Sequence, residues 1–443
     1  MQNPTRFQLT ELEAGVGAAD APQLMQIRQQ FPRPVEADVA AAVHRELKPL
    51  INASLMGKRI AITGSSRGIA NLAVVIRECV AALRLVGAEP FVVPGMGSHG
   101  GATASGQEGV LRDTNAITTE SVGCPIVSSM DVVQVGTTAT GFPVYQDKLC
   151  HEADGVLVVN RVKPHTGFTE RVESGLCKML VIGLGKQKGA SKIHQQALRV
   201  PMGQLILDAS RIIVESDRPR LIGGLALVEN AFKETAVVKG VSMANHQQMV
   251  DSEAALLETA YELLPRLPFD DLDALIVDEI GKNISGSGMD SNVIAKKEGL
   301  TKPRIGAIYV RGLTPETHGN ATGIGFADLM PRALVEQIDL NSTYMNAFTA
   351  KRPVVGKLPM VMESELQALQ VLMNFRQHED PQSLRLVWIK STAKLSEMWV
   401  SGAFAQEVAD NPRLQIISPA QPMRFCGSGN LQPPSAPPVP SGH

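Results

Sequence analysis

Net charge, paired cysteines and long apolar runs are all scarce in this chain, and each scarcity excludes a class of protein. The net charge is only -2 over 443 residues, so no strongly basic face is available to bind nucleic acid. No run of eighteen apolar residues is present, so we expect no membrane span. The first twenty residues are polar and carry acidic side chains, which is unlike a signal peptide.

The five cysteines are odd in number and never stand in Cys-x-x-Cys spacing. Such usage is typical of a reducing compartment and indicates neither a disulfide framework nor a zinc knuckle. We therefore expect a cytoplasmic protein. The chain is too long for one ordinary core, and its 44% apolar content indicates a globular protein.

Strand and helix patterns alternate along the chain and predict an α/β protein. We expect two domains, each with a mostly parallel or mixed sheet flanked by helices, and an active site in the cleft between the domains. The expected strands are 59–63, 90–93, 155–160, 221–228, 236–241, 274–277, 305–310 and 384–389, with a hairpin at 132–145. The expected helices are 71–85, 246–264, 326–337 and 364–375.

The segment Pro265-Arg266-Leu267-Pro268 interrupts the pattern and predicts a domain boundary. Residues 1–268 are then the N-terminal domain, which carries the candidate site, and residues 269–427 the C-terminal domain. Residues 428–443 are rich in proline, serine and glycine, which predicts a disordered tail.

The turn Gly64-Ser65-Ser66-Arg67-Gly68 follows an expected strand and resembles the dinucleotide-binding turn of the short-chain dehydrogenases. However, Ala70 stands where that turn needs a further glycine. That family also needs a Tyr-x-x-x-Lys pair, and none of the four tyrosines has a lysine four residues on. A dehydrogenase is therefore the weaker interpretation.

A glycine-rich loop follows the expected strand 90–93 and contains a histidine. The backbone N–H groups of Gly97, Ser98 and Gly100 can meet a phosphate or carboxylate there. His99 lies inside the loop, at the carboxyl edge of a parallel sheet, where α/β proteins place their ligands. The alternative is that His99 has no role in chemistry and only hydrogen-bonds the backbone of its loop.

His165 repeats this placement, because it follows the expected strand 155–160 and Pro164. Two histidines at strand ends can face each other across a cleft. Imidazole titrates near neutral pH, so such a pair suits a reaction that needs an acid or base on either side of one carbon atom.

Most of the segment from Met56 to His194 resembles the nickel-pincer lactate racemase family, in which a covalently held, nickel-bearing pyridinium nucleotide mediates racemisation of 2-hydroxy acids; the second half of the chain resembles it only weakly. The matching features are a G-x-G-x-H loop that contains His99, a histidine directly after a proline at His165, and Lys178, which follows Gly175 by three residues. His194 follows that lysine by the family's sixteen residues. The step from His165 to Lys178 is thirteen residues, about three longer than in the lactate enzymes.

The resemblance implies a role for each of these side chains. Lys178 would carry the nickel-pincer nucleotide (pyridinium-3,5-bisthiocarboxylic acid mononucleotide nickel), and His194 would bind the nickel as one imidazole ligand. His99 and His165 would alternate as acid and base while hydride moves between C2 of the substrate and the cofactor ring. The alternative for Lys178 and His194 is a surface position on a helix.

The chain also departs from the family pattern. Arg67 keeps an arginine that can clamp a carboxylate, but Gly64 stands where the family has an acid. The family's glutamine-and-lysine pair is not cleanly present in the second half, where Lys282 or Lys296 could replace the lysine. A 2-hydroxy acid larger or more polar than lactate, such as a sugar acid, is therefore the expected substrate.

These expectations define an isomerase that inverts C2 of a small 2-hydroxy acid, with cofactor-synthesis and nickel-insertion proteins as partners. Two alternatives stay open: an NAD(P)-dependent dehydrogenase, and a non-catalytic protein that binds an organic anion or the cofactor. Substitution of His99 and His165 separates the last of these, because a carrier would keep its affinity for the ligand.

Overall fold

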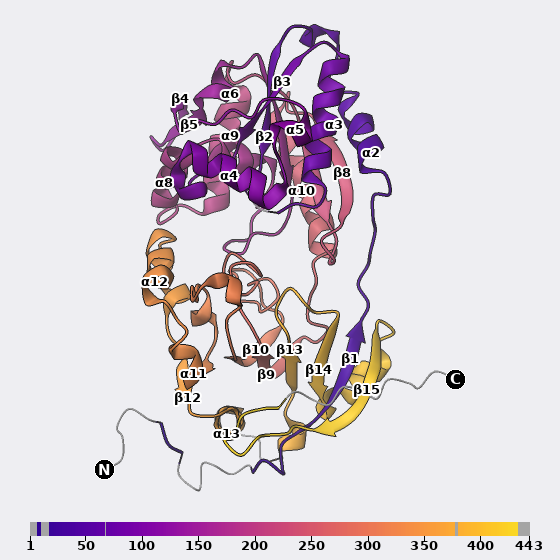
Figure 1. Cartoon of the computed structure of the whole chain (residues 1–443), viewed down its shortest axis with the longest axis vertical. Helices are drawn as coiled ribbons and strands as arrows, with labels where there is room; N and C mark the ends of the chain where they lie inside the picture. The colour runs from indigo at the N-terminus through magenta and orange to yellow at the C-terminus, as the bar shows by residue number, and fades with distance from the viewer. Residues whose placement is uncertain (1–6, 10–16, 67, 377–379, 433–443) are drawn as a thin grey trace. The chain divides into compact units, whose positions relative to one another are not determined.

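A computed structural model describes residues 7–9, 17–66, 68–376 and 380–432. The fold is mixed α/β, as the sequence predicts, and Figure 1 shows the order of its elements. Contacts divide the chain into two units, one formed by Pro32–Leu264 and the other by Met1–Phe31 together with Pro265–His443. Within the described residues, no helix is both long and apolar enough to cross a membrane.

The unit formed by Pro32–Leu264 is built on a five-stranded sheet in the order β3-β2-β6-β7-β8. All its neighbouring strands are parallel except β7 and β8, which are antiparallel. The strands are β2 (Arg59–Gly64), β3 (Glu89–Pro94), β6 (Gly155–Arg161), β7 (Leu221–Glu229) and β8 (Thr235–Val241). The hairpin expected at 132–145 is present as β4 (Val132–Thr137) and β5 (Pro143–Asp147).

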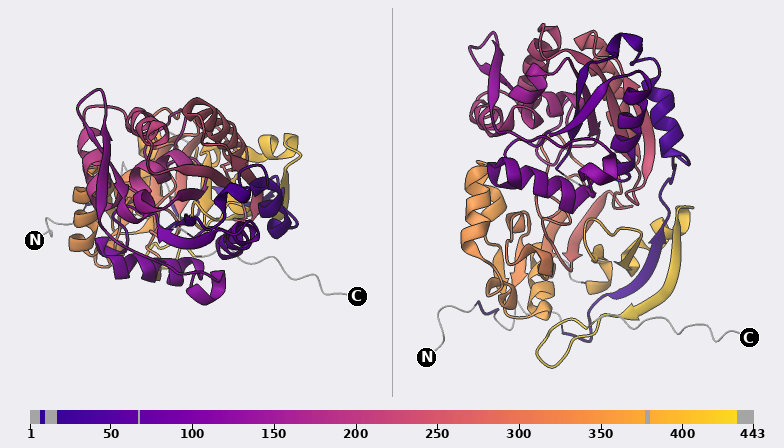
Figure 2. Two further views of the ribbon diagram at one scale, coloured as in Figure 1. Left: turned by 90° about the horizontal axis from the view of Figure 1, so that it is seen from above. Right: turned by 45° about the horizontal axis from the view of Figure 1, so that its top comes forward.

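Helices cover both faces of this sheet (Figure 2). Successive strand residues point to opposite faces, and both sets are apolar, so each face needs a layer of helices to bury it. On one face Ile60 and Leu157 pack with α2 (Val39–Leu47) and α3 (Leu72–Leu85). On the other face Ala61 and Val156 share a core with helices that come later in the chain. Those helices are α7 (Leu176–Lys178), α9 (Met202–Glu215) and α10 (His246–Glu262).

The second unit contains an eight-stranded sheet in the order β12-β11-β10-β9-β13-β14-β1-β15. Its strands β9 to β13 pair in parallel, whereas β14, β1 and β15 add antiparallel pairs. The bounds are β1 (Gln23–Gln29), β9 (Asp271–Val277), β10 (Arg304–Val310), β11 (Leu329–Pro331), β12 (Met360–Met362), β13 (Leu386–Ile389), β14 (Glu397–Ser401) and β15 (Leu414–Pro422). Helix α13 (Glu365–Arg376) packs on one face of this sheet, and α14 (Ala405–Asp410) on the other.

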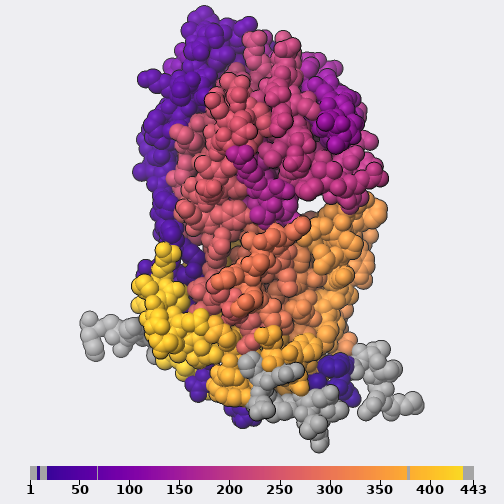
Figure 3. Space-filling view, turned by 180° about the vertical axis from the view of Figure 1, so that it is seen from behind, coloured from indigo at the N-terminus to yellow at the C-terminus, as the bar shows by residue number. Residues whose placement is uncertain are grey.

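Strand β1 lies in this sheet between β14 and β15, although it belongs to the first tenth of the chain. Residues 17–31 are therefore not part of the unit that holds most of residues 1–268, in contrast to the boundaries expected from the sequence. Strand β15, yellow in Figure 3, is the outer edge of the sheet and is largely exposed.

Two further expectations differ from the structure. The helix expected at 326–337 is replaced by β11 and a short helix α11 (Arg332–Val335), because Pro331 ends the strand and cannot continue a helix. The tail expected to be disordered from residue 428 is ordered as far as residue 432: Leu431 is buried and pairs with Phe425. Residues 433–443 lie outside the described residues.

Candidate functional site

The loop that carries His99 follows β3 and packs tightly against the chain around residue 183. Gly97 has a φ of 60° and its N–H donates to the Gly183 carbonyl at 3.0 Å. A Cβ at Gly95 would overlap the Met179 sulfur, so glycine is needed at both positions. The loop leads into α4 (Ala104–Asn115), whose N-terminus is capped by the side chain of Thr103.

Two fully buried side chains, Gln107 and Lys186, hydrogen-bond the backbone of this loop and of the strand end before it. The side-chain amide of Gln107 donates to the Gly97 carbonyl at 2.9 Å and to the His99 carbonyl at 3.4 Å. The Lys186 ammonium donates to the Pro94 carbonyl at 2.6 Å and to Gln107 Oε1 at 3.1 Å. Sequence reasoning missed both residues, because a lysine at the start of a glycine-flanked helix is normally solvated.

His99 itself is exposed, and its Nδ1 lies 2.6 Å from the hydroxyl oxygen of Ser66. Ser66 belongs to the turn after β2, so the structure brings the glycine loop and that turn together. Ser98 beside it is also exposed, whereas Gly97 is buried and Gly100 is half-buried.

His165 follows β6 and is half-buried. Its backbone N–H donates to Glu173 Oε2 at 2.5 Å, and its Nδ1 accepts the Gly167 N–H at 2.9 Å. The Phe168 ring lies against the imidazole with centroids 4.3 Å apart. The carboxylate of Glu173 is itself buried and accepts a hydrogen bond from the Tyr261 hydroxyl at 2.8 Å.

The topology places His99 and His165 at the same edge of the sheet. Strands β3 and β6 flank β2 in parallel, so the two strand ends lie about 10 Å apart, with the turn that carries Ser66 between them. This arrangement is the one expected for ligand binding at the carboxyl edge of an α/β sheet.

Lys178 lies at the end of α7 and is half-buried. A π-helical segment, Met179–Gly183, follows directly, and such segments occur frequently at functional sites. Asn160 links this region to the turn after β2: its amide donates to the Gly175 carbonyl at 2.7 Å, and its Oδ1 accepts from the Ser65 hydroxyl at 2.8 Å. Sequence reasoning did not single out Asn160, because a strand-end asparagine gives no signal by itself.

Glu253 on α10 supports the start of α7. Its carboxylate accepts the Cys177 N–H at 2.8 Å, next to Lys178 in the chain. The side chain is fully buried, and this burial raises its pKa to about 7. The Cys177 thiol is buried as well, and its pKa is raised well above the usual range, first by burial and then by the Glu253 charge, so it is not a reactive thiolate.

His194 lies on α8 (Lys186–Gln196) and is exposed over part of its surface. Its pKa is lowered, mainly because protein atoms displace water from the ring and secondly because of the positive charge of Lys178. Lys178 and His194 are therefore close enough to interact electrostatically. The described residues contain no group of three or more His, Cys, Asp or Glu side chains that could hold a metal.

The remaining candidates are placed as follows. Arg67 lies outside the described residues. Lys282 belongs to the other unit, where it is half-buried and hydrogen-bonds Asn346. Lys296 is exposed, whereas Lys297, which the sequence did not single out, is buried and donates to Asn292 Oδ1 at 3.2 Å.

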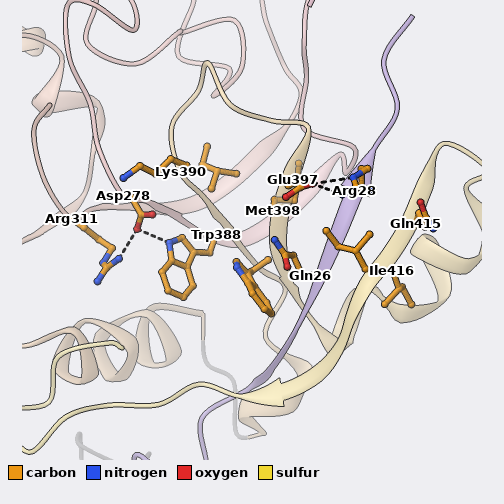
Figure 4. Close-up of a pocket in the computed structure, with 13 residues that line it drawn as sticks. Gln26, Arg28, Asp278, Arg311, Trp388, Lys390, Glu397, Met398, Gln415 and Ile416 are labelled. Carbon is orange, nitrogen blue, oxygen red and sulfur yellow. Dashed lines mark hydrogen bonds and ion pairs between the residues drawn. The ribbon is translucent and has the colours of Figure 1, made fainter. Parts of the chain in front are cut away.

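A hollow of about 910 Å³ lies in that same unit, beside the ends of β9, β10 and β13 (Figure 4). Its charged groups are already paired: Arg311 with Asp278 at 2.6 Å, Arg28 with Glu397 at 2.7 Å, and Lys390 with Glu279 at 3.1 Å. The Trp388 indole N–H also donates to Asp278 at 2.7 Å. Because these charges already have partners, we assign no ligand to the hollow.

No family model matches the sequence, and no curated protein matches it either. Among solved structures, the fold is similar to that of the lactate racemase apoprotein from Thermoanaerobacterium thermosaccharolyticum. The two chains share 14% identity with a TM-score of 0.50, and the match covers 81% of this chain and 95% of that one. The chain therefore has a lactate racemase-like fold, and any relationship is distant.

Proposed function

We propose that this protein is an isomerase that inverts C2 of a 2-hydroxy carboxylic acid. The observation that carries the proposal is the placement of His99 and His165 at the ends of β3 and β6, on either side of the turn after β2. The lactate racemase-like fold supports the same reaction class. A substrate larger or more polar than lactate agrees with Gly64 in place of the family's acid.

The residues of this chain fit a tethered nickel-pincer nucleotide. The Lys178 amine is half-buried next to a π-helical segment. The pKa of the nearby His194 is lowered, mainly by burial, and this favours the neutral imidazole that can ligate nickel. A single imidazole is sufficient where the nucleotide brings sulfur and carbon donors. When bound, the nucleotide would supply a hydride acceptor.

The other residues bind and orient the substrate in this proposal. His99 is exposed and can reach the substrate hydroxyl proton, and Ser66 holds its ring. Gly95 and Gly97 let the loop pack against residues 179–184, and this packing fixes the position of His99. Arg67 and Lys282 are proposed substrate contacts, by analogy with the family pattern. Proteins that make the cofactor and insert nickel are proposed partners, and the cytoplasm is the proposed location.

The dehydrogenase alternative is less favoured. Gly64 is the last residue of β2, and a Cβ at this position would overlap the side chain of Leu111 from α4. The glycine is therefore explained by packing, without a dinucleotide.

The test is to purify the protein from a host that makes the nickel-pincer nucleotide, and to measure its intact mass and nickel content. We expect a mass above that of the polypeptide and about one nickel per chain. K178Q should show neither, whereas K192Q, an exposed lysine on α8, should show both. A wild-type chain with the bare mass and no nickel contradicts the proposal. Inversion of C2 is then assayed on a panel of hydroxy acids by chiral chromatography.

A further inference from the structure

The two histidines differ in what their Nδ1 atoms contact. Nδ1 of His165 accepts a hydrogen bond from the Gly167 backbone N–H at 2.9 Å. A backbone N–H can only donate, so Nδ1 of His165 carries no proton. In the neutral ring the proton is then on Nε2, which is a hydrogen-bond donor and has no lone pair in the ring plane.

The surroundings of His165 keep its ring in this state. Protonation of Nδ1 would point its N–H at the Gly167 N–H. The repulsion between these two donors opposes formation of an imidazolium. The loop is held by the bond from the His165 backbone to buried Glu173, and that carboxylate is held in turn by Tyr261. Phe168 lies against the ring and limits its rotation.

His99 has a partner of a different kind. The Ser66 hydroxyl, 2.6 Å from His99 Nδ1, can accept as well as donate a hydrogen bond. His99 can therefore hold its proton on Nδ1 and present a lone pair on Nε2. When Nε2 takes up a proton, Ser66 still accepts from Nδ1–H, so the imidazolium is also satisfied.

From this difference we infer that the two histidines have unequal roles: His99 is the single proton acceptor, and His165 is a neutral hydrogen-bond donor to a substrate oxygen through Nε2–H. The inference rests on the proposed isomerase. His99 Nε2 would accept the proton of the substrate hydroxyl and return it in the reverse step, and the tethered nucleotide, when bound, would supply the acceptor for the C2 hydride. Inversion then comes from the 2-oxo acid presenting its other face, without an exchange of roles between the histidines.

The first test reads protonation directly and needs no activity. ¹⁵N NMR of the imidazole nitrogens in the purified protein at mildly basic pH should show His165 with an unprotonated Nδ1 and a protonated Nε2. G167A keeps the N–H donor and should give the same pattern. G167P removes the donor and should give a mixture of the two tautomers. A wild-type His165 with a protonated Nδ1 overturns the inference.

The second test compares H99Q with H165Q in the loaded enzyme. Glutamine can donate a hydrogen bond but cannot accept a proton as a base. H165Q should keep at least a tenth of the C2 inversion rate, whereas H99Q should lose about a hundred- to ten-thousandfold, the usual contribution of a general base. Equal losses in the two variants overturn the unequal roles. A loaded wild type that inverts no hydroxy acid instead overturns the proposed function, while the NMR test still decides the state of His165.

Discussion

The Lys186 ammonium lies 2.9 Å from the Asp147 carboxylate, and neither side chain is exposed to solvent. Lys186 is the first residue of α8, the helix that also carries His194, and it adopts a φ of 52°. Burial raises the pKa of Asp147, and the Lys186 charge opposes that rise. One buried ion pair therefore connects the hairpin β4–β5 to α8, and through Gln107 to the loop of His99.

Replacing Lys186 should strongly destabilise the protein. K186M leaves the Asp147 carboxylate buried without its counter-ion, and loss of one partner of a buried pair typically costs about 3–5 kcal/mol. Urea unfolding of the bare polypeptide measures the change. D147N added to K186M should recover part of the loss, because the amide is neutral and its oxygen still caps α6 (Lys148–Glu152). K192Q is the control and should stay within about 0.5 kcal/mol of the wild type; a K186M variant as stable as this control would contradict the prediction.

Gln107 should control the mobility of the His99 loop. Q107L removes the donor to the carbonyls of Gly97 and His99 and leaves them buried or half-buried without it, at a cost of about 1–3 kcal/mol. Hydrogen exchange measured by mass spectrometry should be at least tenfold faster in peptides covering residues 95–100. E108Q changes an exposed neighbour on α4 and should leave that exchange unaltered. Unchanged exchange in Q107L would show that the loop is held by other contacts.

Glu253 should make stability depend on pH. Its pKa is raised to about 7 in the folded protein, against an ordinary value of 4.5, so the folded state binds more protons than the unfolded state between these values. The contribution of Glu253 to the free energy of unfolding is therefore largest below about pH 4.5. It falls by up to about 3 kcal/mol as the pH rises through about 7. Urea unfolding of wild type and E253Q at pH 5 and pH 8 measures the difference. The wild type should lose more stability between these pH values than E253Q, and equal losses would contradict the assignment.

His194 should affect nickel without affecting the covalent tether. In protein purified from a host that makes the cofactor, H194A should keep the added mass at Lys178 but lose most of the nickel, because one imidazole ligand is missing. Intact mass and elemental analysis measure the two quantities separately. Loss of the added mass in H194A, or full retention of nickel, would be inconsistent with His194 as the ligand.

Local patterns predicted much of the fold. The parallel pair β2 and β3, the hairpin β4–β5 and helix α10 all lie where apolar periodicity placed them, because these segments bury a continuous or alternating apolar face. The helix expected at 326–337 was wrong because Pro331, which ends β11, lacks the backbone N–H that a continuous helix needs there. The pairing of β1 with β14 and β15 could not be predicted, since the partners are more than 350 residues apart in sequence.

The candidate site shows the same division. His99 and His165 were proposed as site residues from their positions after strands, and both strands end at one edge of the sheet. Lys186 had no distinguishing signal, since only tertiary contacts remove it from water. The buried Lys297 was likewise overlooked in favour of its exposed neighbour Lys296.

By itself, the sequence determined the α/β class, the glycine loop and the histidines that follow two strands, because these depend on side-chain chemistry and short-range spacing. Tertiary structure alone decided which sheet β1 joins, which lysines are buried, and that a backbone N–H occupies one nitrogen of His165 while a serine hydroxyl faces His99. The physical reason is that burial and hydrogen-bond partners arise from segments distant in sequence, and these set the charge and the protonation of a side chain.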